Sequence, residues 1–450
     1  MKSRDIFSGL ESSAQRWHGT GCRTIRWGVF LFAVWGQLQA QDPATDLSAP
    51  LIGRPLLSQK ISTIPCAGYD FPVATVLDLA VAVDAQQRLH LLWTGKLEDY
   101  FDYFLFYSFS TNGRDWSPCQ ILDYWNTFEP KIVSDSARNR IHILYRNETG
   151  ILHRIVQSGV MSDAGLIDLG NAPKIALEES TGRLHCIWHE GYFYDVSSTV
   201  RQWRYRTFFS TWTETGWAAR RQVVTNEDTA GATVAGSGTS QVMLAWFQDF
   251  GASQPKDNSD PGIPTFPRSA FSQDSGLHFP ARVAVTDGNG YPYPETIFNF
   301  VLGYSAADGK FHLMGMHAKA PGHSVVDHFV WDGVGAWSNP ENMSNNTSRW
   351  AYPLYVGSPR NSKKTLFLWS VEGQGWQLGL RDRQGGWELR PLGQQIVNQG
   401  YSITNSAWDV DGTFIHLVLA GTQNGQPGVY YLQIPIGGGK EVIYLPLILK

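Results

Sequence analysis

A short phrase that recurs along the chain limits what this sequence can fold into. It is a turn followed by a strand that reads apolar, His, apolar, apolar, aromatic, and it is clearest at residues 84–93 (DAQQRLHLLW). Related phrases occupy residues 135–145, 179–188, 307–314 and 409–419, and two copies without the histidine occupy residues 238–246 and 360–369. The equivalent positions are His90, His142, His185, Met243, His312, Phe367 and His416, with intervals of 52, 43, 58, 69, 55 and 49 residues.

A repeat of roughly 40–55 residues built of short strands and turns is typical of a β-propeller blade. The first copy predicts four strands, at residues 76–83, 89–93, 103–109 and near 120–123. Such a blade cannot bury both of its faces alone, so blades stack on one another. We therefore predict an all-β, seven-bladed propeller of four-stranded antiparallel blades. Six or eight blades remain open because the closure of the ring is not visible in the sequence.

The first 40 residues differ from the rest of the chain. Five basic residues precede a short apolar run at residues 27–35, and Leu38-Gln39-Ala40 follows. This pattern predicts a secretory signal peptide that is cleaved near Ala40. The alternative is an N-terminal anchor helix, although the run is well short of the roughly 20 apolar residues that a membrane span needs. We expect a secreted or cell-surface protein.

The remaining boundaries follow from composition. Residues 41–58 read as a linker, 59–436 as the propeller, and 437–450 as a Gly-rich hinge with an apolar tail. The tail, EVIYLPLILK, resembles the short YLPL endings of exported proteins from filamentous bacteria, which implies a bacterial source and a role in sorting or surface retention. The alternative is a strand that completes the last blade.

Charge and cysteine content exclude several classes of function. Removal of residues 1–40 leaves a formal charge of −7 and no Lys/Arg run, so we expect no nucleic-acid partner. Cys66 and Cys119 flank the first blade and are candidates for a disulfide, whereas Cys186 lies in a repeat strand and reads as a buried thiol. No two cysteines have metal-ligand spacing, so we expect no metal and no other cofactor.

A second recurring element is a turn that ends in an aromatic residue. Its copies are residues 110–116 (STNGRDW), 272–279 (SQDSGLHF), 213–217, 331–337 and 383–387. Asp or Asn accepts bonds from backbone N–H groups, Gly takes positive φ, and the aromatic ring packs between strands. Across residues 60–436 these turns resemble the Asp-box of sialidase-like (BNR-repeat) propellers. The resemblance implies that the turns are structural and lie opposite the ligand site.

The ligand site is expected on the other face, which is formed by the loops from strand two to strand three and from each blade to the next. Aromatic rings stack on sugar C–H faces while polar groups hold hydroxyls, so these loops predict a carbohydrate or glycoconjugate partner, and a cell-surface protein is a further candidate partner. No membrane span is expected after cleavage. The predicted ligand-binding residues are Trp125, Arg146, Tyr192, Tyr194, Arg268, Trp350 and Tyr401.

Catalysis is the less favoured reading. The resemblance implies an arginine within a Phe/Tyr-Arg-Ile-Pro stretch, but the nearest match, Gly53-Arg54-Pro55, lacks the Ile. A general glycosidase needs two carboxylates about 5–10 Å apart, for which Glu148, Glu190 and Asp249 are candidates. The sequence therefore favours a glycan-binding propeller. The alternatives are an exo-acting, sialidase-like glycoside hydrolase and a protein-interaction scaffold without a sugar ligand.

Overall fold

The structure is a computed structural model, and the part of it that is described belongs to one compact unit, residues 39–450. The described residues are 59–60, 73–97, 102–195, 201–223, 228–249, 266–279, 282–285, 297–320, 323–344, 350–358, 362–372, 374–392, 401–423 and 426–436. The predicted signal peptide and the C-terminal tail lie outside them. Among these residues, no helix is long and apolar enough to cross a membrane.

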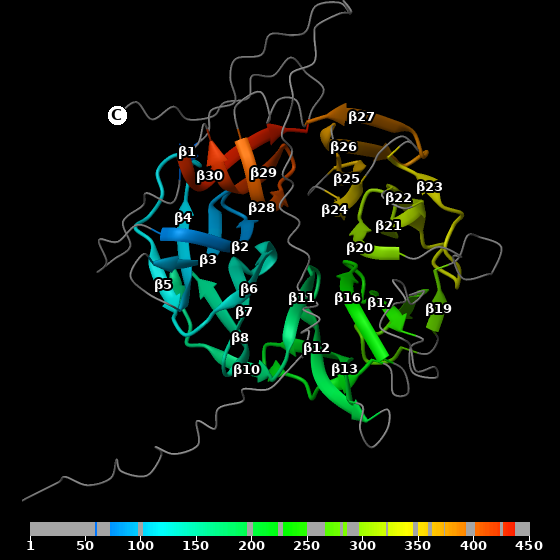
Figure 1. The fold of residues 1–450 in the computed structure, drawn as a ribbon, viewed down its shortest axis with the longest axis horizontal. Helices are drawn as coiled ribbons and strands as arrows, with labels where there is room; N and C mark the ends of the chain where they lie inside the picture. The colour runs from blue at the N-terminus through cyan, green and yellow to red at the C-terminus, as the bar shows by residue number, and fades with distance from the viewer. Residues whose placement is uncertain are drawn as a thin grey trace, which may run out of the picture. The chain divides into compact units, whose positions relative to one another are not determined.

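The described strands form seven antiparallel sheets, which confirms the predicted seven-bladed propeller (Figure 1). From the innermost strand outward, blade 1 is β2 (Val73–Val83), β3 (Leu89–Leu97), β4 (Tyr103–Ser110) and β5 (Gln120–Asp123), and blade 2 is β6 (Phe128–Asp135), β7 (Arg140–Asn147), β8 (Gly150–Gln157) and β10 (Gly165–Asp168). Blade 3 is β11 (Asn171–Glu178), β12 (Arg183–Asp195), β13 (Arg201–Thr213) and β14 (Gly216–Trp217), and blade 4 is β16 (Asp228–Gly236), β17 (Val242–Asp249), β18 (Phe266–Ser272) and β19 (Arg282–Ala284). Blade 5 is β20 (Ile297–Ser305), β21 (Lys310–Ala320), β22 (His323–Val330) and β23 (Glu341–Asn342), and blade 6 is β24 (Ala351–Gly357), β25 (Lys364–Val371), β26 (Gly375–Asp382) and β27 (Trp387–Pro391). Two short strands, β9 (Val160–Met161) and β15 (Arg221–Gln222), add to blades 2 and 3.

Blade 7 closes the ring by combining both ends of the propeller. Its inner strands are β28 (Tyr401–Val410), β29 (Phe414–Gln423) and β30 (Gln426–Pro435), and its outermost strand is β1 (Gln59–Lys60). Gln59 pairs with Tyr431 and Lys60 with Tyr430, both antiparallel. Backbone hydrogen bonds between segments about 370 residues apart therefore join the N-terminal end to the last blade.

The second strand of each blade packs against two neighbouring blades at once. In β3, Leu91 and Trp93 lie in a cluster with Val418 and Tyr431 of blade 7, whereas Leu92 lies with Ile143 of blade 2. Successive side chains of a strand point to opposite faces, so this alternation follows from the repeat phrase. The hydrophobic core consequently lies between the blades and not within any one of them.

The repeat histidines form buried hydrogen-bond networks within the blades. His90 Nδ1 lies 2.8 Å from the Tyr107 hydroxyl and its Nε2 lies 3.1 Å from Asp84 Oδ2. Blade 7 has the same arrangement: His416 lies 2.8 Å from the Tyr431 hydroxyl and 3.0 Å from Asp411. In blade 5, His312 lies against Asp308 and against His328, which takes the place of the tyrosine. Because both ring nitrogens of His90, His312 and His416 have partners, these three histidines are structural.

The five aromatic turns connect blades 1, 3, 4, 5 and 6 each to the preceding blade. Trp337 Nε1 donates to Ser269 Oγ of blade 4 at 2.9 Å, and Trp387 Nε1 donates to a carboxylate oxygen of blade 5 at 2.6 Å. Trp217 Nε1 donates to His153 of blade 2, Phe279 packs edge-on against Phe209 of blade 3, and Trp116 packs edge-on against Tyr431 of blade 7. In the turn before Trp337, Asp332 Oδ1 accepts three backbone N–H bonds of 2.7–3.1 Å. The turns therefore fix the angle between adjacent blades.

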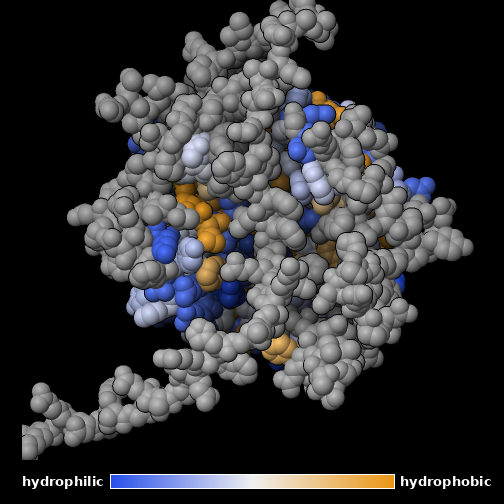
Figure 2. Space-filling model, viewed as in Figure 1, coloured by the Kyte–Doolittle hydropathy of each residue, from blue (hydrophilic) through white to orange (hydrophobic). Residues whose placement is uncertain are grey.

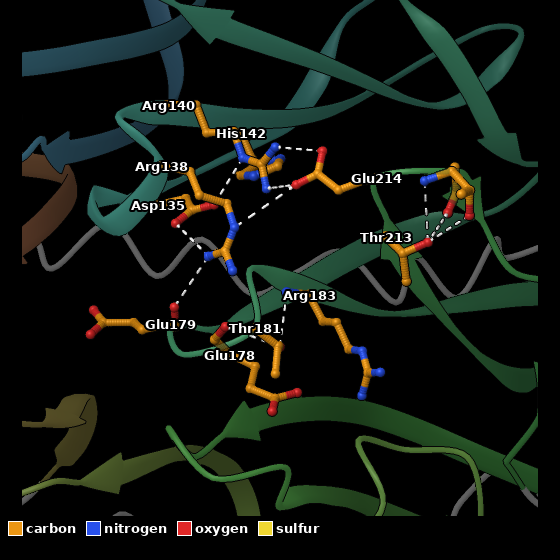
Figure 3. Close-up of polar contacts among 12 residues, drawn as sticks. Asp135, Arg138, Arg140, His142, Glu178, Glu179, Thr181, Arg183, Thr213 and Glu214 are labelled. Atoms are coloured by element: carbon orange, nitrogen blue, oxygen red, sulfur yellow. Dashed lines mark hydrogen bonds and ion pairs between the residues drawn. The ribbon is translucent and has the colours of Figure 1, made fainter.

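Blades 2 and 3 are also joined by ion pairs (Figure 3). Arg140 binds Asp135 of its own blade at 2.8 Å and Glu214 of blade 3 through both terminal nitrogens, at 2.9 Å and 2.7 Å. Arg138 donates to the backbone oxygens of Glu179 and Ser180, both at 3.3 Å. Arg140 and Asp135 are buried, so the loss of one partner would leave an uncompensated charge.

Burial gives this fold a defined dependence on pH. Burial lowers the pKa of His153, His189 and His328 to about 4, from an ordinary value near 6.5. Between those values the unfolded chain binds protons that the folded chain does not, so the free energy of unfolding decreases as the pH falls from about 6.5 to 4. We expect each of these histidines to contribute about 1–2 kcal/mol to the loss between pH 7 and pH 5.

Urea unfolding at pH 7 and pH 5 measures this loss. His328→Gln should reduce the difference between the two pH values, and His278→Gln is the matched control because that side chain is 83% exposed. Equal differences in wild type and His328→Gln would contradict the assignment.

A tight contact at Gly182 gives a second prediction for the joint between blades 2 and 3. Gly182 has φ +71°, and an added Cβ would meet the guanidinium of Arg138 at 2.5 Å. We expect Gly182→Ala to lower the free energy of unfolding by about 2 kcal/mol, as measured in urea, through both backbone strain and displacement of Arg138. Gly159→Ala is the control, because Gly159 has φ +79° and no neighbour within 4 Å. Equal losses would exclude the contact with Arg138.

Candidate functional site

The described part of the predicted ligand face is best defined between blades 1 and 2. The segment that joins the two blades contacts the turn between β7 and β8. Asn126 Nδ2 donates to Glu148 Oε1 at 2.7 Å, and Asn147 Nδ2 donates to Asp123 Oδ2 at 3.1 Å. The structure therefore brings two predicted residues, Trp125 and Glu148, onto one small surface, because Trp125 is adjacent to Asn126.

Two aromatic side chains stand exposed on this surface. Tyr124 is 56% exposed and Trp125 is 57% exposed, and their ring centroids lie 5.7 Å apart at 50°. The backbone beneath them is strained, since Trp125 has φ +92° and Asn126 φ +52°. A left-handed conformation is costly for an aromatic residue, and it usually persists only where the surrounding structure imposes it. Figure 2 shows hydrophilic residues over β7 and β8 beside hydrophobic residues over β2.

Arg146, a predicted ligand-binding residue, lies beside this surface on β7. Its Nε lies 3.4 Å from Glu129 Oε2, and its guanidinium lies 5.0 Å from the centre of the Phe128 ring. The same Glu129 oxygen accepts the backbone N–H of Ala172 in blade 3 at 2.7 Å. Glu129 therefore holds Arg146 and two blades together, and about a third of the Arg146 side chain remains exposed.

Glu190 occupies a different environment from Glu148. Its Oε2 lies 3.1 Å from Arg220, which also binds Asp168 at 2.9 Å and covers the ring of Phe208 at 4.5 Å. The hydrogen bond with Asp168 raises the pKa of Arg220 and so keeps it charged. Each of the two candidate carboxylates thus has its own polar partner, and a catalytic role for either stays a prediction.

The other predicted residues are dispersed over the blades. The ring of Tyr192 is covered by the guanidinium of Arg206 at 4.1 Å, and Trp350 stacks on Tyr352 with centroids 6.4 Å apart. Arg268 lies in β18 opposite Trp246. Tyr194, Asp249 and Tyr401 have their backbones in β12, β17 and β28, but their side chains lie outside the described part of the structure.

The sequence reading missed a charged group on the innermost strands. Lys131 in β6 pairs with the residue two after His142, and Lys174 in β11 pairs with the residue two after His185, so they hold equivalent positions in adjacent blades. Both follow a register shift in the inner strand, which re-aims nearby side chains. A repeated Pro-Lys-Ile, at residues 130–132 and 173–175, is the signal that would have revealed them.

The two lysines influence one another. The charge of Lys131 and then burial lower the pKa of Lys174 to about 8, and the carboxylates of Glu129 and Asp78 oppose this effect. Lys131 Nζ donates to the Pro130 oxygen at 3.1 Å. The Lys174 side chain keeps surface accessible to water although protein surrounds it closely enough for burial to affect its pKa. Within the described ranges, no group of three or more His, Cys, Asp or Glu side chains could hold a metal ion.

The two described cysteines are a disulfide-bonded residue, Cys119, and a free buried residue, Cys186. Cys119 is in a disulfide whose partner lies outside the described residues. Cys186 is free and buried, and burial raises the pKa of its thiol. A buried protonated thiol is unreactive, so Cys186 is a packing residue.

The comparisons with known proteins identify the fold alone. No family model matches the sequence, and no curated protein matches it. Among solved structures, the chain is similar to the polysaccharide lyase Uly1, with a TM-score of 0.50 and 11% identity over 83% of this chain and 92% of that one. It is also similar to the Hadza microbial sialidase Hz136 (TM-score 0.42, 11% identity, 81% and 66% coverage) and to the propeller domain of the Trilobed protease from Pyrococcus furiosus (0.47, 12%, 82% and 99%).

Among the described residues, Glu190 pairs only with Arg220, whereas Arg220 pairs with both Glu190 and Asp168, and this difference gives a prediction about stability. Glu190→Gln should lower the free energy of unfolding by less than about 1 kcal/mol, because the ion pair is partly exposed and Arg220 keeps Asp168. Arg220→Met should cost more, since it removes both ion pairs at once. Urea unfolding of the two variants measures the difference, and a larger loss for Glu190→Gln would mean that its carboxylate has a further partner.

Proposed function

We propose that this protein is an exported or cell-surface propeller of sialidase-like type that binds glycans through its loop face, and that a sugar ring docks on Trp125. Export is inferred from the basic and apolar pattern of residues 1–40. The proposal concerns binding, and it assigns no catalytic step to the chain.

The exposure of Trp125 on a strained backbone is the observation that supports this proposal most. Its indole is 57% exposed and lies beside another exposed ring, so it contributes little to the core. A positive φ at tryptophan also costs free energy. Strain of this kind concentrates at functional sites, where a ligand repays it. A flat exposed indole is a suitable platform for the C–H face of a sugar.

Polar groups next to the ring support a carbohydrate over a purely apolar ligand. Glu148 and Asn126 form a hydrogen-bonded pair on the exposed surface, and part of Arg146 is accessible on the next strand. Carboxylate, amide and guanidinium groups can accept from or donate to sugar hydroxyls in several orientations. The likeness to the lyase and the sialidase adds no argument for the ligand, because it is a likeness of fold.

The test is a glycan-binding screen with protein that begins at Gln41. We expect binding to at least one glycan and, for that glycan, a loss of affinity of about tenfold or more in Trp125→Ala, because stacking of the indole is removed. Val334→Ala is the matched control, since Val334 is 91% exposed in the turn between β22 and β23, on the opposite face. Absence of binding across the screen would favour the scaffold alternative.

A second variant separates strain from contact. Trp125→Gly should raise the free energy of unfolding by about 1 kcal/mol, because glycine adopts positive φ without cost, while it abolishes glycan binding. Chemical unfolding and isothermal titration calorimetry measure the two effects. A destabilised Trp125→Gly would show that the indole is part of the core and would refute the platform.

The enzyme alternative is tested on the same preparation. Turnover of a panel of fluorogenic exo-glycosides, sialosides included, that is lost in Glu148→Gln, Glu190→Gln or Asp249→Asn would overturn the binding proposal and make the protein a glycoside hydrolase. Trp125→Ala would then be expected to raise KM more than it lowers kcat.

A further inference from the structure

Two lysines on the innermost strands of blades 2 and 3 form a positively charged position near the axis of the ring. The innermost strands of the seven blades face a common centre (Figure 1). Lys131 and Lys174 stand at equivalent heights on adjacent inner strands, as their pairing with β7 and β12 shows. Lys174 keeps surface accessible to water although it lies on an innermost strand and is surrounded by protein.

Among the described residues, the two carboxylates that influence Lys174, Glu129 and Asp78, already have partners. Glu129 accepts from Ala172 N and lies against Arg146, and its own N–H donates to Asp78 Oδ2 at 3.2 Å. The amide of Asn405 also reaches Asp78, at 3.4 Å. The Lys174 ammonium, by contrast, makes no hydrogen bond or ion pair with any residue in the described part of the chain.

The charges in this group do not balance. Arg146, Lys131 and Lys174 are cationic, whereas Asp78 and Glu129 are anionic, so the group carries one net positive charge when both lysines are protonated. Two ammonium groups that repel each other are stabilised by one anion between them, and the attraction is stronger away from bulk water. One bound anion would therefore neutralise the net charge of this group.

The position is related to the proposed ligand surface by the course of β6. Glu129 precedes Lys131 by two residues, and the strand begins at the loop face, so the lysines lie deeper along the strand than the Glu129–Arg146 pair. A group that enters from the loop face therefore passes Arg146 before it reaches the lysines. This order of cations would guide an anion inward.

We propose that Lys131 and Lys174 form a binding site for a single oxyanion group, a carboxylate or a sulfate, that enters the centre of the propeller from the loop face. The group belongs either to an acidic sugar of the glycan or to a free inorganic anion. The first source rests on the proposed glycan binding, whereas the site itself does not.

The primary experiment is titration of the protein from Gln41 with sodium sulfate at constant ionic strength, with chloride as the balancing salt. Calorimetry and thermal unfolding should both show sulfate binding at pH 7, with the unfolding midpoint rising with sulfate. Lys174→Met and Lys131→Met should each weaken this binding at least tenfold. Lys363→Met is the control, because Lys363 is an exposed lysine outside the ring centre, and it should leave binding unchanged.

Two further measurements identify the cause and the source. Sulfate affinity should decrease as the pH rises through about 8, because Lys174 loses its proton there, and in Lys131→Met this decrease should move to higher pH. Glucuronate that displaces sulfate, with glucose as the neutral control, would identify an acidic sugar as the ligand. Sulfate binding without displacement would identify a free inorganic anion.

The outcomes separate this site from glycan binding. Trp125→Ala should retain full sulfate affinity even if it binds no glycan. Absence of sulfate and glucuronate binding in wild type, or equal affinities in Lys174→Met and Lys363→Met, would overturn the site. Either result would leave the proposal for Trp125 standing.

Discussion

Packing of each blade against its two neighbours is the interaction on which the rest of this structure depends. A single four-stranded sheet exposes both faces, and strand two of each blade carries large apolar side chains on both. In β3 these are Leu91 and Trp93 on one face and Leu92 on the other, all nearly inaccessible to solvent. No blade is therefore stable alone, and β1 is needed to complete blade 7 beside blade 1.

The two faces of the propeller use their polar residues differently. On the turn face, the Asp84–His90–Tyr107 network is buried and hydrogen-bonded, and the buried Arg140 is paired with the buried Asp135 and the exposed Glu214. Buried polar groups of this kind stabilise the fold only while every partner is present. On the loop face, Trp125 and Glu148 are exposed, and the backbone is strained. The paired polar groups of the turn face join the blades, whereas the strained residues of the loop face are the ones proposed to bind a ligand.

Blades 2 and 3 combine both kinds of polar group, structural ion pairs (Figure 3) and a proposed ligand site. Blades 2 and 3 are fastened at the turn face by Arg138 and Arg140, and at the centre they present Lys131 and Lys174. The fastening opposes the mutual repulsion of the two lysines. An arrangement that keeps like charges together at a structural cost is expected where a ligand binds.

The sequence alone determined the propeller class, the strands of the first blade and the alternation of buried side chains, because these depend on periodicity along the chain. It predicted seven blades, and the structure settled that number by showing how the ring closes. It also placed Trp125, Arg146 and Glu148 on one face, because the face follows from strand order. Only the tertiary structure decided that β1 closes blade 7, that Glu190 is held by Arg220 and that Lys131 lies beside Lys174. These contacts join residues whose distance along the chain says nothing about their distance in space.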